Sequence, residues 1–563
     1  MNVLGRVRYR GSQIIDAMAE ELGPKTSIRA VARMASRPTS GAHGMDPPGL
    51  EPLIWKGRQM SNFVQKAALG LSLLAFSLAT HSFSSASAQT GTIVVAQSSD
   101  ALTLDPSVDT SPISLNIFKN IYDQLTDIAA DGSVKPQLAT SWEVSADAKV
   151  WTFTIRANVK FHDGSMLSVD DVVDSFQKIM KDEKSPVRAY LVKVASVEKA
   201  GDDKVRFTLT VPYAPFDRQV SLISILPRKA YAERGASFAT NPVGSGPFRV
   251  VKWIKDDRIE LAANPDYFGG APKVATVIFR PVPSESARAA ALASGEIDIV
   301  PLLPPPLVER LGTTRGIGVS KVDSNRVLYI GFDVTNPLLS KQKLRQAIDH
   351  AINREAITTR LLRGLGKPIG QPVAPVTFGY DASIPAPIFD VDLAKRLVKE
   401  SGYKGEPILF QYPNNRYAFG QEVAQAIQGY LSAVGINVEM QGMEYSAFFP
   451  LWAAKKLNSI HMFAFGPSIM DAELPLGSLY ETGPSRGYWS DKKIDELVAA
   501  QRAESNPAKR RSIIAEIWKA SAEFVPYSML YNEVQAYGVR AGVKWQPRPD
   551  ERLLFGDAEA ARK

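Results

Sequence analysis

The chain offers few side chains that could hold a metal or attack a substrate. Three histidines follow the first 88 residues, namely His162, His350 and His461. None has a second histidine or a carboxylate at the spacing that places two metal ligands on one helix face. The chain also has no cysteine, which removes thiol nucleophiles and cysteine-type zinc sites. The sequence therefore predicts no metal site and no cofactor.

Two glycine-containing segments approach catalytic or nucleotide-binding motifs but lack essential residues. The segment Gly244-Ser245-Gly246 lacks the glycine that a nucleophile elbow needs two residues before its serine, since position 243 is valine. Residues 364–370 depart from the dinucleotide-binding spacing, and Pro368 would disrupt the helix that such a loop begins. A Walker motif does not occur. We therefore expect no catalytic residue, and any coupled nucleotide hydrolysis would belong to a partner protein.

Charge and composition exclude some classes of function. The 563 residues include 66 Lys and Arg against 58 Asp and Glu, of which ten and five lie in the first 88. The remaining 56 basic and 53 acidic residues leave no basic surface that would neutralise nucleic-acid phosphates. With 45% hydrophobic and 22% charged residues, the composition is that of a globular protein. The length predicts two or more lobes.

Residues 60–88 have the order of a secretory signal peptide. A lysine precedes an apolar run over Ala67–Ala79, and a small-residue exit ends at Ala88. The run is shorter than the roughly 20 residues of a membrane-spanning helix, and the exit suits signal peptidase. We expect cleavage near Ala88 and a periplasmic protein, with an uncleaved anchor as the alternative. Residues 1–59 are interpreted as a non-native or disordered extension, although a biological extension remains open.

Alternating apolar residues predict a β-rich block in the first half of the exported chain. Thr92 to Ala96 is expected to be a short buried strand, followed by a helix around Ile113–Leu125. Val150–Ile155 and Lys204–Val211 each alternate with a period of two residues. We therefore expect both of these strands in one sheet.

Helical spacing dominates the second half of the chain. Apolar residues share one face of a helix around 344–352, capped by Ser340, and of another around 393–398, capped by Asp390. Residues 407–440 predict a strand, helix and strand of a parallel sheet. Long Gly/Ser linkers are absent, which favours lobes joined by crossing strands and hinged around a cleft.

An ordered series of motifs runs along residues 91–556. The most specific stretch reads Val150-Trp-Thr-Phe-Thr-Ile-Arg156 and continues through Phe161-His-Asp-Gly164. The other segments are Thr92–Ala96, Leu104–Pro106, Asp170–Val172, Asn241–Phe248, Asn264–Phe268, Ser294–Ile299 and Leu344–Arg354. Together they resemble the dipeptide, oligopeptide and nickel-type extracellular solute-binding proteins (family 5) of ABC transporters. We expect the aromatic residues of these motifs in the core and Gly164 in a turn.

The resemblance implies an α/β fold with two lobes, the large type II periplasmic binding protein fold, and a ligand in the cleft between the lobes. It maps the first lobe to 89–126, 241–328 and 533–556, a β-rich subdomain to 127–240, and the second lobe to 329–532. It also implies a monomeric periplasmic substrate-binding protein without enzymatic activity. An ABC permease and ATPase would be its partners, and a small-molecule solute its ligand.

The resemblance also indicates where the ligand lies. In peptide-binding members, an aspartate shortly after a tryptophan pairs with the free α-amine of the peptide. Here Phe465 falls at the tryptophan position and Ser468 at the aspartate position. A buried ammonium needs a compensating anion, so the missing carboxylate argues against ordinary free peptides. Asp471 is a candidate substitute, with a purely structural role as the alternative.

Five further residues are candidate ligand contacts. Tyr445 falls at an aromatic cleft position, with core packing as the alternative. Asn414 and Arg416 follow a predicted strand end, where ligands gather in α/β sheets. The guanidinium of Arg416 could bind a carboxylate or a phosphate, or simply lie in an exposed loop. Thr110 and Ser111, in the matching loop of the first lobe, could supply hydroxyl groups.

Two other functions remain open from the sequence. One is a secreted hydrolase, which would have to act without a recognisable nucleophile motif. The other is a signalling or chaperone binding module on the same fold, because fold does not fix function. Peptide derivatives, sugars, opine-like compounds and metal chelates all remain open as ligands.

Overall fold

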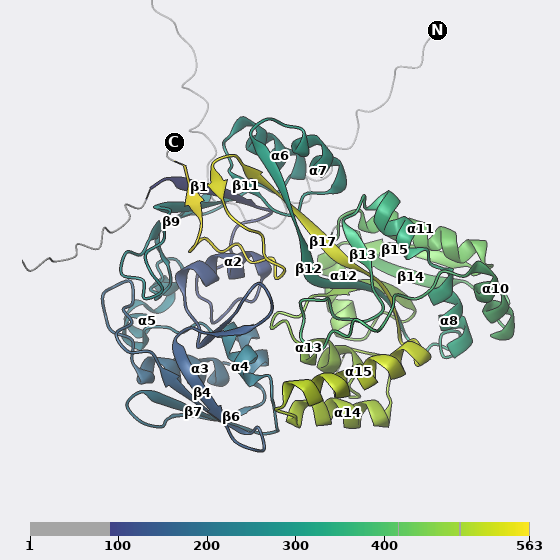
Figure 1. Cartoon of the computed structure of the whole chain (residues 1–563), viewed down its shortest axis with the longest axis horizontal. Helices are drawn as coiled ribbons and strands as arrows, with labels where there is room; N and C mark the ends of the chain where they lie inside the picture. The colour runs from purple at the N-terminus through teal and green to yellow at the C-terminus, as the bar shows by residue number, and fades with distance from the viewer. Residues whose placement is uncertain (1–89, 415, 484–485, 562–563) are drawn as a thin grey trace, which may run out of the picture. The chain divides into compact units, whose positions relative to one another are not determined.

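The computed structural model describes residues 90–414, 416–483 and 486–561. The predicted extension over 1–59 and the predicted signal peptide, with its cut near Ala88, lie outside these residues. An 11-stranded sheet, with strand order β15-β14-β16-β12-β17-β11-β1-β10-β9-β8 and β13 beside β17, runs through the described chain (Figure 1). Two long strands in its middle connect its two halves.

The first half of this sheet centres on β1 (Thr92–Gln97), the strand predicted at this position. It pairs in parallel with β10 (Thr276–Pro281) and β11 (Ile299–Val300). The antiparallel strands β9 (Arg258–Ala263) and β8 (Phe248–Ile254) complete this edge. Helix α2 begins at Pro112 but ends at Ile121, four residues earlier than expected. The chain turns there because the Ile121 carbonyl accepts a hydrogen bond from the Gly246 amide at 2.8 Å.

The second half contains the strand, helix and strand predicted over 407–440. Strand β14 (Ile408–Pro413) and strand β15 (Val438–Met443) pair in parallel and are connected by helix α11 (Gly420–Ala433). Strand β16 (Ile460–Phe465) continues the sheet. This part of the prediction is confirmed.

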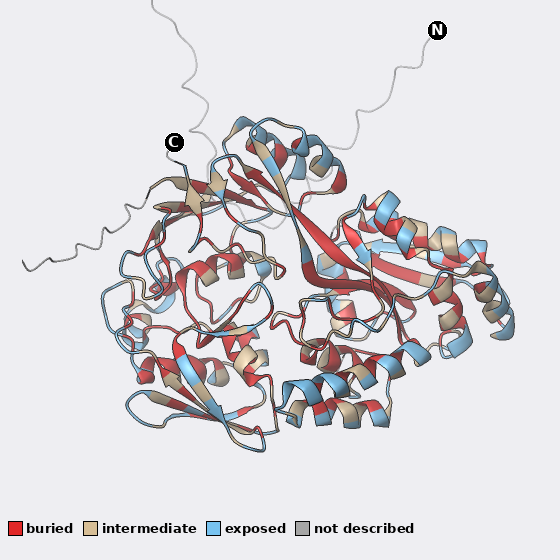
Figure 2. Cartoon of the chain, in the orientation of Figure 1, coloured by how far each residue is buried: buried red, intermediate tan, exposed pale blue. Residues whose placement is uncertain are grey.

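Strands β12 (Ile317–Phe332) and β17 (Tyr527–Arg540) run antiparallel along nearly their whole length. At one end β17 pairs with β11, and at the other end β12 pairs with β16. The two strands therefore cross from one half of the sheet to the other (Figure 1). This agrees with the expectation based on the absence of long Gly/Ser linkers. Figure 2 shows long stretches of both strands as buried. The fold is the two-lobed α/β fold that the resemblance implied.

A separate four-stranded sheet has the order β4-β5-β7-β6. It consists of β4 (Ala139–Val144), β5 (Val150–Ile155), β6 (Val194–Lys199) and β7 (Lys204–Leu209). The predicted pairing of the second and fourth of these strands is confirmed. Trp151, Phe153 and Phe161 are buried in its core, and Gly164 occupies a turn with φ of +85°. One apolar core includes this sheet and the β1 half of the main sheet, and a second surrounds β12, β14 and β16.

The two amphipathic helices of the second half form where the spacing predicted them. They are α8 (Gln342–Ala351) and α10 (Val391–Glu400). Asp390 caps the second helix by accepting a hydrogen bond from the Leu393 amide at 2.8 Å, as predicted. The prediction that Ser340 caps α8 is wrong. Its hydroxyl donates to the carbonyl of Pro337 at 3.0 Å, and Lys341 occupies the cap position without a side-chain hydrogen bond.

The other elements lie around these sheets and cores. The longer helices are α3 (Val169–Lys181), α5 (Arg228–Arg234), α6 (Glu285–Ser294), α7 (Pro305–Gly312), α12 (Tyr445–Ala453), α14 (Lys492–Ala503) and α15 (Pro507–Phe524). Single helical turns form α4 (Phe216–Gln219), α9 (Arg354–Ala356) and α13 (Glu473–Pro475). Short strands are β2 (Thr126–Ile128), β3 (Val134–Pro136), β13 (Gly366–Pro368), β18 (Val543–Lys544) and β19 (Glu559–Ala560).

Candidate functional site

A cavity of about 580 Å³ lies where segments from both halves of the main sheet meet. Residues after β1 and around the start of α2 line one side of it. The loop after β14, helix α12 and the end of β16 line another side. Residues 325–326 in the crossing strand β12 and residues 550–553 near the C-terminus complete the lining. Its volume is that of a typical small-molecule site.

An aromatic wall forms one side of the cavity. It consists of Tyr445, Phe449, Trp452, Phe463 and Phe465. The first three project from one face of α12, because they are spaced by four and three residues. The ring centroids of Trp452 and Phe463 lie 4.2 Å apart, and those of Phe449 and Tyr445 lie 5.6 Å apart. Such a wall offers flat apolar surface to a ligand.

Arginines supply most of the charge in the lining, which includes Arg288, Arg326, Arg416, Arg486 and Arg552. The guanidinium of Arg416 lies 5.5 Å from the ring centroid of Tyr445, and that of Arg486 lies 4.9 Å from Trp452. These contacts hold two cations over the aromatic wall. Arg288 differs, because it is buried and donates hydrogen bonds to the carbonyls of Val282 and Pro283 at 2.8 and 2.9 Å.

The two carboxylates of the lining, Asp550 and Glu551, already have partners. Asp550 accepts hydrogen bonds from Arg548 at 3.0 and 2.7 Å. Glu551 forms an ion pair with Arg326, which also binds Glu533 at 3.0 Å. Burial alone would raise the pKa of each lining carboxyl, but the neighbouring guanidinium groups outweigh it and hold the pKa below its usual value. Both carboxylates are therefore charged and compensated at neutral pH.

Five of the eight residues expected at the ligand site line this cavity. They are Thr110, Arg416, Tyr445, Phe465 and Ser468. The sequence separates them by more than 350 positions, and the fold brings them together. Ser468 also borders an adjoining cavity of about 30 Å³, together with Asp550 and Arg552.

The other three expected residues lie outside the lining. The hydroxyl of Ser111 donates to Asp109 at 2.9 Å and accepts from the Ser114 amide, so it caps helix α2. Asn414 is exposed, and its backbone N–H donates to the Met443 carbonyl at 2.9 Å beside the end of β14. The third, Asp471, is completely buried.

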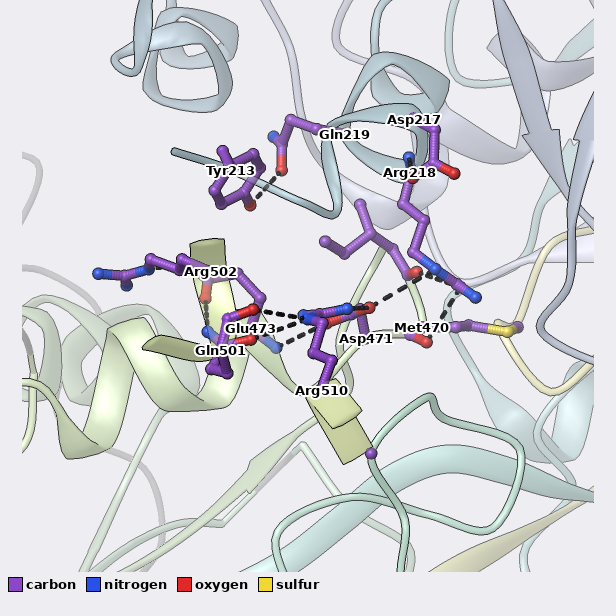
Figure 3. Close-up of polar contacts among 12 residues, drawn as sticks. Tyr213, Asp217, Arg218, Gln219, Met470, Asp471, Glu473, Gln501, Arg502 and Arg510 are labelled. Atoms are coloured by element: carbon purple, nitrogen blue, oxygen red, sulfur yellow. Dashed lines mark hydrogen bonds and ion pairs between the residues drawn. The ribbon is translucent and has the colours of Figure 1, made fainter. Parts of the chain in front are cut away.

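Asp471 is enclosed by two arginines (Figure 3). Arg510 of α15 donates from its two terminal nitrogens to the two carboxylate oxygens, at 2.7 and 2.5 Å. The Nε atom of Arg218, on α4, lies 3.5 Å from Oδ2. Burial alone would raise the pKa of Asp471, but the charges of these arginines outweigh it and lower the pKa. This carboxylate is occupied by structural partners.

Arg218 also joins segments that are far apart in the sequence. Besides Asp471, Arg218 donates to the carbonyls of Gly132, Ile469 and Met470 at 2.8, 3.2 and 3.3 Å. It therefore ties the loop after β16 to the start of the β-rich block. The sequence position of Asp471 gave no indication of either arginine partner.

Several lining residues were missed from the sequence. Phe449 and Trp452 could have been found, because their helical spacing places them on the same face as Tyr445. Arg486 and Arg552 carry no such signal, since only tertiary folding brings these segments to the cavity. Within the part of the chain that the structure describes, no group of three or more metal-binding side chains comes together. None of the described helices combines the length and apolar composition that a membrane span needs.

Known proteins are similar to this chain in sequence and in fold. The dipeptide-binding protein of Escherichia coli K12 is 28% identical over 515 residues, which cover 84% of this chain and 94% of that protein. A Helicobacter pylori binding protein, DppA, solved with the peptide STSA, matches with a TM-score of 0.72 and 26% identity over 84% of this chain and 98% of that one. AgaA from A. tumefaciens R10, solved with agropinic acid, gives a TM-score of 0.72 and 26% identity, covering 84% and 99%.

The family model covers the centre of the chain. It describes bacterial extracellular solute-binding proteins, family 5, and matches residues 133–486. That range includes the β-rich sheet, the pairing of β12 with β16, and the aromatic wall. The chain belongs to family 5 of the bacterial extracellular solute-binding proteins.

Proposed function

We propose that this substrate-binding protein captures a small solute in the 580 Å³ cavity and delivers it to the permease and ATPase of an ABC importer. The observation that carries the proposal is the origin of the lining. Thr110 comes from the β1 half of the sheet, Tyr445 from the β14 half, and Arg326 from a strand that crosses between them. A ligand in this position contacts both lobes at once, so its binding favours the closed arrangement of the lobes.

The crossing strands supply a place for a hinge. The pairing of β12 with β17 shifts register between Asp323 and Val327 and again between Leu328 and Tyr329. Irregular pairing of this kind bends a strand locally and interrupts its hydrogen-bond ladder. Because Arg326 lies within the first irregularity and also lines the cavity, lobe rotation at this point would open and close the site.

The relatives support a transport role at the cell exterior. The relatives include a dipeptide-binding protein, a glutathione-binding protein and a protein named as a probable D,D-dipeptide-binding periplasmic protein. The expected signal peptide agrees with export to the periplasm. We propose that the protein acts there as a monomer and releases its ligand chemically unchanged.

A thermal-shift screen of the purified exported protein tests this function. A ligand at about 100 times its dissociation constant stabilises a folded protein by roughly 2.7 kcal/mol, which is a readily measured shift. Each hit is then incubated with the protein and recovered, and we expect it unaltered. Deletion of the gene should abolish uptake of that ligand. A screen without any shift would contradict ligand capture, and a chemically altered ligand would favour a hydrolase.

A further inference from the structure

We infer that the ligand is a small organic oxyanion, carrying a carboxylate or phosphate group on an apolar body, and that its recognition does not require a free ammonium. This inference rests on the proposed function and specifies the substrate class of the same cavity. Arg416, Arg486 and Arg552 bind the anionic group, and the aromatic wall binds the apolar body.

The charged side chains of the lining are mostly basic. Five arginines face two carboxylates, Asp550 and Glu551. Each of these carboxylates already has a guanidinium partner, so neither neutralises a further arginine by direct contact. The cavity is therefore positively charged, and a cavity with low-dielectric walls concentrates ligands of the opposite charge.

Three arginines of the lining are the candidate anion-binding groups. Across residues 90–414, 416–483 and 486–561, none of Arg416, Arg486 and Arg552 forms an ion pair with a carboxylate. Arg416 acts on Glu551 only from a longer range, and the backbone amide of Arg552, not its side chain, bonds to Asp550 at 3.2 Å. Their guanidinium groups retain the planar donor geometry that suits a carboxylate or a phosphate.

Among the described residues that line the cavity, no carboxylate is left uncompensated for a ligand ammonium. Ser468 lines the cavity. The family resemblance aligns it with the aspartate that binds the α-amine in peptide-binding members, and a hydroxyl supplies no negative charge. The nearby Asp471 is completely buried, and both of its oxygens accept hydrogen bonds from Arg510. It cannot turn toward the cavity without leaving a buried arginine unpaired, which is costly. A ligand amine would therefore lack the partner that a peptide receptor provides.

The aromatic wall is the surface that contacts the apolar body of the ligand. Phe449 is a large apolar side chain that is 36% exposed. Its ring lies beside Tyr445 and Trp452 and borders the cavity. Covering such a ring with an apolar ligand surface removes it from water and adds affinity.

A charge-sorted thermal-shift screen tests the inference. It compares carboxylates, phosphate esters, neutral sugars, amines and free peptides. It also includes a matched set of N-acetyl-phenylalanyl-glutamate, phenylalanyl-glutamate and phenylalanyl-glutamine amide, which differ in their carboxylate and amine groups. We expect shifts from anions, and N-acetylation should not abolish a shift. Carboxylate and phosphate hits identify the source of the anionic group.

Substitutions then connect the hits to the arginines. Arg416→Gln, Arg486→Gln and Arg552→Gln should each weaken binding of an anionic hit about tenfold or more, because each removes a charged hydrogen-bond donor. Arg416→Lys keeps the charge but loses the planar fork, so it should weaken binding less than Arg416→Gln. The matched control Arg315→Gln alters an exposed arginine outside the cavity and should leave affinity unchanged.

The outcomes separate the inference from the proposed function. Hits that all require a free ammonium, or anionic hits that tolerate all three glutamine variants in a folded protein, would overturn the inference and leave ligand capture intact. A screen without any shift would overturn ligand capture, and the inference with it. Anionic hits weakened by the cavity variants and not by Arg315→Gln would support both.

Discussion

Arg510 and Asp471 form a bidentate ion pair (Figure 3). Each carboxylate oxygen accepts a hydrogen bond from one guanidinium nitrogen, at 2.5 and 2.7 Å. Asp471 is 0% exposed, and Arg510 is buried as well. The pair joins the loop after β16 to helix α15. It explains why a carboxylate only three residues after Ser468 does not line the cavity.

The replacement Asp471→Asn should strongly destabilise the protein. It leaves the buried guanidinium of Arg510 without a negative partner, which typically costs about 3–5 kcal/mol. Urea unfolding measures the loss as a lower free energy of unfolding. The control Asp323→Asn breaks an exposed ion pair with Lys367 and should cost no more than about 1 kcal/mol. Equal effects of the two substitutions would contradict a structural role for Asp471.

The carboxyl group of Asp123 should make stability depend on pH. Burial raises its pKa to about 6, although hydrogen bonds from Ser245 and Tyr267 oppose the rise. A carboxyl whose folded pKa is raised contributes its stability fully below the unfolded pKa of about 3.9. That contribution is lost as the pH rises through the folded pKa.

The measurement compares wild-type protein with Asp123→Asn by urea unfolding at several pH values. The free energy of unfolding of the wild type, relative to the variant, should fall by about 2 kcal/mol between pH 4 and pH 7. The comparison cancels titrations that both proteins share. A difference that stays flat or grows with pH would show that the pKa is not raised.

The aromatic wall should contribute to affinity more than to stability. Phe449→Ala removes a ring that is already 36% exposed, so we expect a small change in the melting temperature. Loss of its ligand contact should weaken binding by roughly tenfold, because aromatic contacts add about 0.5–1.5 kcal/mol to the burial of their area.

The matched control is Phe389→Ala, since Phe389 is 40% exposed and lies outside the cavity, with its ring against Tyr430. Calorimetric titration with a ligand from the screen should distinguish the two variants. If both lose affinity equally, the wall does not contact the ligand.

Gly244 should tolerate no side chain. A Cβ atom at this position would collide with the carbonyl oxygen of Ile121, which belongs to the backbone and cannot rotate away. Gly244→Ala should therefore destabilise the protein by about 1–3 kcal/mol in urea unfolding. Gly429→Ala, in the interior of α11 with open space around it, should instead stabilise by about 0.5–1 kcal/mol. Destabilisation by both would point to a general intolerance of alanine.

Elements whose signal is local were predictable. The period-two alternation over Val150–Ile155 and Lys204–Val211 reflects one buried and one less buried face. The two strands do pair, although the second ends at Leu209, two residues earlier than predicted. The unit of β14, α11 and β15 was also predictable, because the apolar spacing of each of its elements is a local signal. The predicted end of α2 lay four residues too late in the chain. A hydrogen bond from Gly246, 125 positions away, ends that helix at Ile121.

The sequence by itself determined the order of the elements, the family resemblance and the absence of a carboxylate at Ser468, because each is a property of local residue types and their spacing. Tertiary structure alone decided which charges meet. It paired Asp471 with Arg510, 39 residues later, and brought Arg552 into a cavity with Arg416. Contacts of this range depend on how strands and helices pack, and no local pattern of residues encodes them.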